Sequence, residues 1–170
     1  MKKIKKEKKT MSNVKNIFIS HHGKDDEHVQ RLKQRLKDEG YEVRNSSVDS
    51  TKHQEKRPSD ETIKKDLRDG IGWAGTFICL VGEDTHTRDW VDFEIEQAYK
   101  QGKPIVGVYM HGCSESVELP EKLEKYRSYI IGWNSLDKLG DILDGKSVPA
   151  ENPDGTTKNP SYTVVRVTCN

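Results

Sequence analysis

Long hydrophobic runs and paired cysteines are both missing from this sequence of 170 residues. No apolar stretch approaches the ~18 residues that cross a membrane, and the lysine-rich start lacks the apolar core of a signal peptide. The three cysteines, Cys79, Cys113 and Cys169, are widely spaced and form no CxxC pair. This argues against a disulfide framework and a structural zinc site. We therefore expect a cytoplasmic protein with no membrane partner and no metal.

The usual motifs for binding phosphate or for nucleophilic catalysis are also missing. There is no GxxxxGK[ST] loop and no GxGxxG after the first apolar run. A phospho-receiver would carry aspartates where the first and third apolar runs end, but these ends read Ile19–His21 and Leu80–Gly82. No Ser-His-Asp or Cys-His arrangement follows from the spacing, because Cys79 lies inside an apolar run.

The composition predicts a modest core with solvated segments around it. Hydrophobic residues make up 32% of the chain and charged residues 34%. The whole chain carries +1, and the six lysines and one glutamate among the first ten residues give that segment +5, which leaves −4 elsewhere. A body of this charge is not suited to nucleic acid. We interpret residues 1–14 as a disordered basic leader, 15–146 as one domain, and 147–170 as a tail in which residues 162–168 suit an added edge strand.

Apolar runs alternate along the chain with segments of helical spacing. Strands are predicted at 16–20, 41–43, 76–81, 105–110 and 129–131. Helices are predicted at 25–40, 59–72, 88–101, 119–126 and 136–143. This alternation predicts the α/β class, with a flavodoxin-like, doubly wound sheet of about five parallel strands in the order 2-1-3-4-5. Such sheets bind ligands outside the carboxyl ends of their strands. The polar stretch 44–58 is either a functional loop or disordered.

One acidic residue of the predicted helix 88–101 lies on its apolar side. With Trp90 at 0° and about 100° per residue, Glu94 falls at about 40°, while Asp92 and Glu96 fall at about 200° and 240°, on the face expected to be solvated. The apolar arc contains Trp90, Val91, Ile95 and Ala98. A carboxylate in that arc is costly unless it is paired or lines a cleft. Glu94 is therefore either a functional group or the member of a structural pair.

The end of the first predicted strand carries polar groups at the same rim. Ser20, His21 and His22 offer a hydroxyl and two imidazoles, which suit a phosphate or a ribose, or form a plain polar turn. His28 and His86, like His53, are expected to be solvated. His22 and His111 have no metal-ligand spacing.

Several motifs resemble bacterial TIR-like proteins, and among them the branch found in the Thoeris anti-phage system. The resemblance rests on Asn16–His22, Val43–Ser47, Trp73, Ala74, Thr85, Trp90–Ile95, Ile105–Gly112 and Ile131–Asn134, and covers about residues 15–145. It implies an NAD+ glycohydrolase of the ADP-ribosyl cyclase type. Such an enzyme takes NAD as its substrate, needs no metal, releases nicotinamide, and makes a cyclic ADP-ribose isomer or a related ADP-ribose signal that activates a separate effector.

The same resemblance implies roles for individual residues. Glu94 matches the catalytic glutamate, and Ser20 and His21, with His22 beside them, match the substrate-binding loop after the first strand. Asp49 and Lys52 lie in the segment equivalent to the long second loop. Trp90 would stack on nicotinamide or pack against the sheet. Sites of this family are often completed by a neighbouring subunit, which implies self-association through TIR surfaces.

Two other functions remain open at this point. A non-catalytic TIR scaffold would assemble protein partners and use Glu94 only structurally. A nucleoside glycosyl transferase of similar architecture would also place a carboxylate near ribose, but would release a base from nucleosides.

Overall fold

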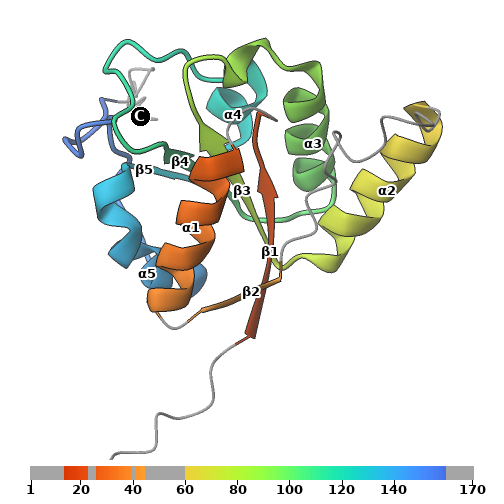
Figure 1. Cartoon of the computed structure of the whole chain (residues 1–170), viewed down its shortest axis with the longest axis horizontal. Helices are drawn as coiled ribbons and strands as arrows, with labels where there is room; N and C mark the ends of the chain where they lie inside the picture. Colours follow the sequence, from red (N-terminus) through yellow and green to blue (C-terminus); the bar gives the residue numbers. More distant parts are fainter. Residues whose placement is uncertain (1–13, 23–25, 40, 45–59, 160–170) are drawn as a thin grey trace, which may run out of the picture.

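A parallel sheet of five strands organises the chain (Figure 1). We analysed a computed structural model, which describes residues 14–22, 26–39, 41–44 and 60–159. The strands are β1 (Val14–Ser20), β2 (Glu42–Arg44), β3 (Thr76–Val81), β4 (Ile105–Tyr109) and β5 (Tyr129–Ile131). Their order in the sheet is β2-β1-β3-β4-β5, and every pairing is parallel. The predicted fold class and strand order are confirmed.

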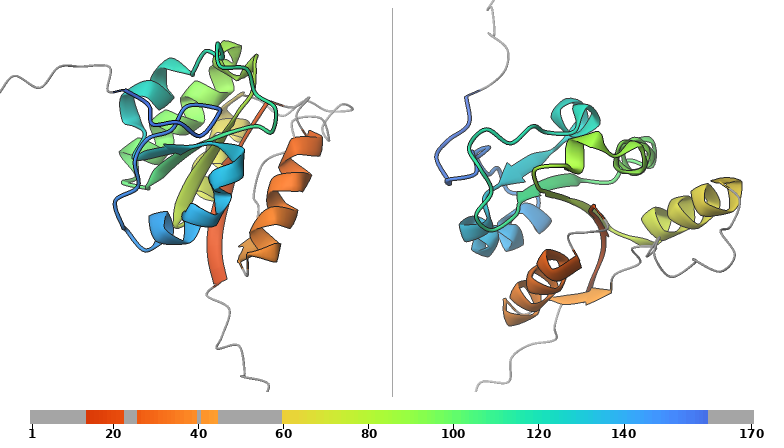
Figure 2. Two further views of the ribbon diagram at one scale, coloured as in Figure 1. Left: turned by 90° about the vertical axis from the view of Figure 1, so that its left-hand side faces the viewer. Right: turned by 45° about the horizontal axis from the view of Figure 1, so that its top comes forward.

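Helices cover both faces of this sheet (Figure 2). They are α1 (Asp26–Asp38), α2 (Asp60–Trp73), α3 (Asp89–Lys100), α4 (Glu121–Tyr126) and α5 (Leu139–Leu143). Within the described ranges, two 3-10 helices accompany them, η2 (Thr85–Thr87) and η3 (Trp133–Lys138). The last predicted helix is therefore two pieces, because a 3-10 segment with non-helical angles at Ser135 precedes α5. α1 and α5 pack on one face, and α2, α3 and α4 pack on the other.

The alternation of side chains along β1 explains how one strand serves both faces. Ile17 and Ile19 belong to the core under α1 and α5, whereas Phe18 belongs to the core under α2 and α3. Phe18 stacks on Phe77 of β3 with ring centroids 5.6 Å apart. Ser20, two residues beyond Phe18, faces the same side as Phe18. The strand pattern thus delivers a hydroxyl to the α3 side at the carboxyl end of β1.

Several predictions fall on residues outside the described ranges. These are the basic leader up to residue 13, the loop 45–59 and the added edge strand at 162–168. Val14, which the sequence placed in the leader, is instead the first residue of β1. In the described part of the chain, no helix combines the length and apolar character needed to cross a membrane.

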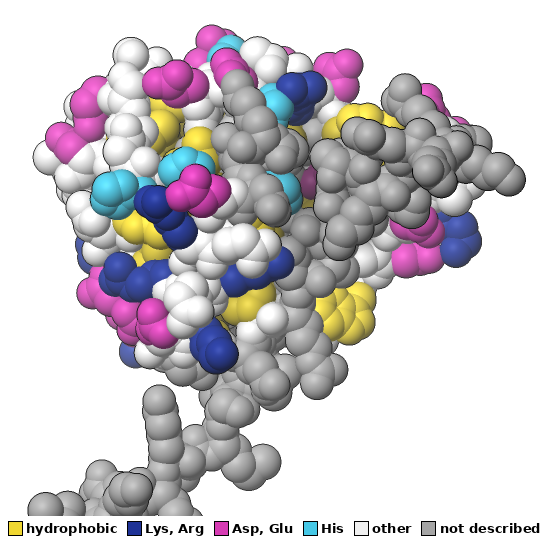
Figure 3. All heavy atoms as spheres, in the orientation of Figure 1, with side chains coloured by type: hydrophobic (Ala, Val, Ile, Leu, Met, Phe, Trp, Pro, Cys, Tyr) yellow, Lys and Arg dark blue, Asp and Glu magenta, His cyan; other side chains and the backbone are white. Residues whose placement is uncertain are grey.

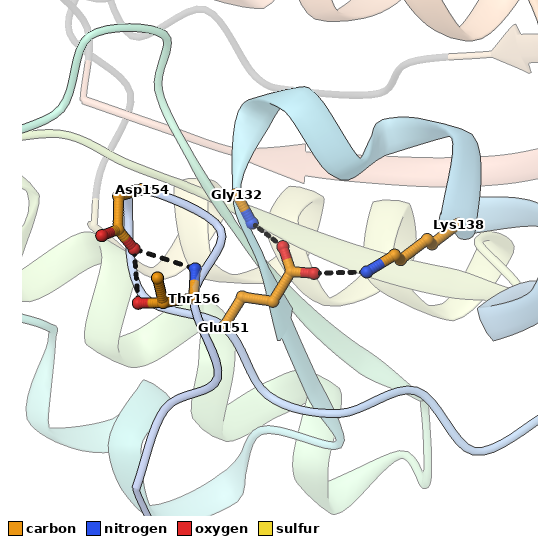
Figure 4. A network of polar contacts seen from close by, with 5 residues as sticks. All are labelled: Gly132, Lys138, Glu151, Asp154 and Thr156. Carbon is orange, nitrogen blue, oxygen red and sulfur yellow. Dashed lines mark hydrogen bonds and ion pairs between the residues drawn. The ribbon is translucent and has the colours of Figure 1, made fainter.

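A buried carboxylate fastens residues 150–158 to the end of β5 (Figure 4). Glu151 is 2% exposed, and it accepts hydrogen bonds from Gly132 N (3.0 Å) and Lys138 Nζ (2.8 Å). Its own amide donates to Ile130 O at 3.0 Å, and an antiparallel bridge joins it to Thr157. We call this network the Glu151 clasp. Burial raises the pKa of the Glu151 carboxyl, but the bonds from Lys138, Ser135 and Gly132 outweigh this and leave it below its usual value.

The clasp gives a prediction for stability. Glu151→Gln should lower the free energy of unfolding by roughly 1–3 kcal/mol at neutral pH, because it replaces charge-assisted bonds with neutral ones. The folded pKa lies below the unfolded value of 4.5, so this contribution is present above pH 4.5 and is lost as the pH falls further. Urea unfolding of the native protein and the variant at pH 7 and at pH 3.5 measures the loss of unfolding free energy and its dependence on pH. Exposed Glu115→Gln is the control, and an equal loss at both pH values would contradict the assignment.

Candidate functional site

Two polar groups face each other where β1 ends and α3 begins its second turn. Ser20 is 1% exposed, and its register partner in β3 is Cys79. Glu94 approaches this pair from α3. It is close enough for its charge to raise the pKa of the Cys79 thiol, and for the Ser20 hydroxyl to lower the pKa of the Glu94 carboxyl. The Glu94 residue as a whole is half-buried, whereas its Oε2 atom is fully enclosed. Among the described residues, neither Ser20 Oγ nor Glu94 Oε2 has a hydrogen-bond partner.

The surroundings of Glu94 favour its neutral form. Burial raises the pKa of its carboxyl from 4.5 to about 8, and the Ser20 hydroxyl acts weakly in the opposite direction. The described part of the structure shows no ion pair to Glu94 that would compensate for the lost hydration. Among the described residues no arginine pairs with Glu94, whereas the Ser20 hydroxyl is near enough to lower the pKa of the carboxyl without forming a hydrogen bond to Oε2. Enclosure without a partner is typical of groups that act on a ligand.

The neighbouring thiol is not a second reactive group. Cys79 is fully buried in β3, and burial raises the pKa of its thiol, with further contributions from the Glu94 and Asp92 carboxylates. A thiol in this state is not a nucleophile at neutral pH. The chemistry of this pair therefore belongs to Glu94 and Ser20.

The prediction that Asp92 lies on a solvated face was wrong. Asp92 is half-buried, and its Oδ1 atom is enclosed without a partner in the described part of the chain. Burial raises the pKa of its carboxyl, and a hydrogen bond from the Lys122 backbone opposes this. The cause is α4, a six-residue helix that packs against this side of α3 and that a wheel drawn for α3 alone does not include.

A buried threonine shapes the turn that carries α3 to this position. Thr85 is 0% exposed, and its Oγ1 atom accepts a hydrogen bond from Gly82 N at 2.8 Å and lies 3.5 Å from Leu80 O. These contacts tie η2 to the end of β3. The sequence offered Thr85 only as part of a family motif, because a threonine between polar residues carries no signal of burial.

The other predicted site residues within the described ranges are His21 and His22, which follow Ser20, and Trp90, which precedes Glu94 on α3. His21 is half-buried, with Nδ1 2.9 Å from His22 O, and His22 is 6% exposed. Trp90 is half-buried beside the core cluster and meets Phe93 edge-on, with ring centroids 5.8 Å apart. The packing expected of Trp90 is therefore observed. Asp49 and Lys52 lie outside the described residues.

Two cavities lie at opposite edges of the sheet, and neither is lined by Glu94 within the described ranges. The larger, of about 500 Å³, is at the amino-terminal edge beside Trp73 and Lys103. The smaller, of about 220 Å³, is at the carboxyl-terminal edge and is lined by His28, Gly82, Glu83, Asp84 and Met110–Cys113. The orientation of Figure 3 shows histidine and acidic side chains near the upper part of the molecule, where the strands end in Figure 1. His28, predicted to be solvated, is half-buried and lines the smaller cavity.

No group of three or more His, Cys, Asp or Glu side chains in the described ranges could hold a metal ion. The residues at the carboxyl-terminal edge instead combine an enclosed carboxylate, a hydroxyl and imidazoles. These groups suit an organic ligand with hydroxyl groups and a cationic centre.

A comparison with family models decides what kind of domain this is. The model described as "Thoeris protein ThsB, TIR-like domain" matches residues 18–115, which include Ser20, Thr85 and Glu94. The chain belongs to this family. The resemblance seen in the sequence is thereby confirmed for the ThsB TIR-like core. β5, α5 and the Glu151 clasp lie beyond the matched residues.

The chain is also similar, at low sequence identity, to several solved structures. A Clostridium botulinum CMP N-glycosidase, BcmB, is 21% identical, with 76% of this chain and 98% of that chain covered and a TM-score of 0.47. A conserved protein from Enterococcus faecalis V583 is 14% identical, covering 77% and 96%, with a TM-score of 0.44. The TIR domains of the Roq1 resistosome are 16% identical, covering 67% and 64%, with a TM-score of 0.43. Curated protein sequences gave no match.

The enclosed carboxyl of this TIR-like domain gives a prediction that needs no enzyme assay. Because the folded pKa of Glu94 is raised, the folded state binds more protons than the unfolded state between pH 4.5 and about 8, and stability falls as pH rises through that range. Glu94→Gln removes the titrating group. The melting temperature of the variant relative to the native protein should therefore increase from pH 5 to pH 8.5.

Glu96→Gln is the matched control for this measurement. Glu96 lies on the far side of α3, and its bond and charge interaction with Lys100 lower the pKa of its carboxyl. Its contribution is present above the unfolded pKa, so this variant should lose melting temperature at neutral pH and not gain it. Parallel pH curves for native protein and Glu94→Gln would show that the Glu94 carboxyl is well hydrated.

Proposed function

We propose that this ThsB TIR-like domain cleaves the bond between nicotinamide and ribose in NAD, with Glu94 as the catalytic carboxylate. The observation that carries the proposal is the enclosed Oε2 atom of Glu94, which lies beside the Ser20 hydroxyl with no partner among the described residues. Family membership supports a site at this position, because the matched residues contain both groups. The released ADP-ribosyl group would be cyclised or conjugated into a signal for a separate effector.

The chemistry asked of Glu94 is electrostatic. When the bond from C1′ of the ribose to the pyridinium nitrogen breaks, its electron pair stays with nicotinamide, which leaves as a neutral molecule. The ribose becomes an oxocarbenium-like cation, and an adjacent carboxylate stabilises that charge. Water or another nucleophile then forms the new bond to C1′ and loses a proton. In a water-poor setting one carboxylate stabilises this cation more than it would in bulk water.

The remaining groups would position the substrate. Ser20 Oγ is available to hydrogen-bond either the Glu94 carboxylate or a ribose hydroxyl. Trp90 lies one turn before Glu94 on the same face of α3 and offers an indole beside the departing nicotinamide. His21 and His22 follow Ser20 at the same rim. Asp49 and Lys52 remain candidates from the family resemblance alone.

Nicotinamide release from NAD tests the proposal directly. Purified protein is incubated with NAD in the presence of lysate from phage-infected cells, since the enzyme can depend on an activator. Glu94→Gln should lower the rate at least about a hundredfold, because it removes the charge that stabilises the transition state. Glu96→Gln should keep the native rate. Release of bases from nucleosides without cleavage of NAD would instead support a nucleoside glycosyl transferase, and no turnover by activated native protein would support a scaffold.

The dependence of the rate on pH gives a second test. The ionised form of Glu94 is the active one, and its pKa in the free protein is raised to about 8. Values of kcat/KM report ionisations of the free enzyme, so kcat/KM for NAD should rise with pH and level off above about 8. A profile that is flat between pH 6 and pH 9 would contradict this role of Glu94.

A further inference from the structure

The cavity of about 220 Å³ at the carboxyl-terminal edge is a second group of polar side chains that the proposed cleavage does not use. It lies beside the ends of β3 and β4 and the first turn of α1, and its walls include Met110, which packs on the core under α1, and Cys113, which packs on the core under α3. We propose that this cavity binds the adenosine half of the substrate. The inference rests on the proposed function and extends it to how a dinucleotide is recognised.

The position of the cavity suits the far end of an extended ligand. Cys79 lies in β3 close to Glu94. Gly82, which directly follows β3, lines the cavity and is three residues further along the chain. An extended chain covers about 10 Å over three residues. A nicotinamide held on the Trp90 side of Glu94 leaves the rest of the molecule to run across the end of β3. The cavity of about 220 Å³ lies in that direction.

The charge of the cavity selects a nucleoside over a phosphate. Glu83 and Asp84 contribute carboxylates, and no lysine or arginine is present among its described lining residues. Carboxylates accept hydrogen bonds from vicinal ribose hydroxyls, whereas they repel phosphate. The volume also falls below the ~300 Å³ at the lower end of sites that enclose a whole drug-sized ligand. A single nucleoside therefore fits these properties better than an entire dinucleotide.

Two imidazoles complete the site. His28 lines the cavity and is half-buried, and its Nδ1 atom is enclosed with no hydrogen-bond partner in the described part of the chain. His111 is exposed at the cavity and meets Trp133 edge-on, with ring centroids 6.3 Å apart. Trp133 begins η3, whose preceding residue, Gly132, is held by the Glu151 clasp. The clasp thus holds the segment that contacts His111.

Calorimetric titration with adenosine tests the assignment without any need for turnover. Native protein should bind adenosine, and Glu83→Gln and His111→Ala should each weaken binding roughly tenfold or more, as expected when a hydrogen bond or an aromatic contact is lost. Glu115→Gln removes an exposed carboxylate outside the cavity and should bind as the native protein does. Glu94→Gln should also bind adenosine normally. Melting temperatures of all variants check that they fold.

A kinetic comparison separates this inference from the proposed function. With activated protein, Glu83→Gln should raise KM for NAD and leave kcat/KM for nicotinamide mononucleotide unchanged, because the latter lacks the adenosine half. The inference is overturned if native protein does not bind adenosine, or if the two cavity variants bind it as tightly as native protein. Failure of the proposed function has a different signature, namely no nicotinamide release from either substrate by activated native protein.

Discussion

The structure around the candidate site depends on the desolvation of one carboxyl group. Glu94 reaches from the second turn of α3 to the end of β1, where the Ser20 hydroxyl is the polar group among the described residues that acts on its carboxyl. The residues that hold it there are apolar and buried, namely Val91, Ile95 and Ala98 on its own helix and Phe18 and Cys79 on the sheet. A helix that packed only for stability would carry an aliphatic side chain at this position. The unfavourable burial therefore identifies the site more specifically than either of the two cavities described above does.

Two groups of side chains divide the chemistry at this edge of the sheet. The α3 side presents an enclosed carboxyl beside an indole, which is suited to a cation that forms during a reaction. The cavity beyond the ends of β3 and β4, beside the first turn of α1, presents acidic groups and imidazoles, which are suited to neutral hydroxyl groups. β3 runs from one to the other, and its central place in the sheet brings both within reach of one extended molecule. β1 and β3 are neighbours in the sheet, although α1, β2 and α2 lie between them in the chain. This topology brings the ends of the two strands together at one edge.

The strands and their order followed from the sequence because each strand is a short apolar run between helical segments. β3 and β5 were located to the residue, since Thr76–Val81 and Tyr129–Ile131 have clear polar limits. The inward direction of Glu94 also followed, because the period of a helix is fixed. The environment of Asp92 and His28 did not follow, because it depends on α4 and on loops that meet only in the folded chain. Periodicity describes one helix, whereas burial depends on its neighbours.

The Glu151 clasp lies some distance along the chain from the residues that define the family, which end at 115. It nevertheless caps the last strand of the sheet. The Glu151 carboxylate accepts a hydrogen bond from the Gly132 amide, and the Glu151 amide donates one to the Ile130 carbonyl of β5. A fragment cut to the family boundary would remove β5 and expose the flank of β4, a row of unpaired amides and carbonyls next to an apolar surface. Excising the matched core alone would thus leave β4 as an open edge, of the kind that pairs with other chains.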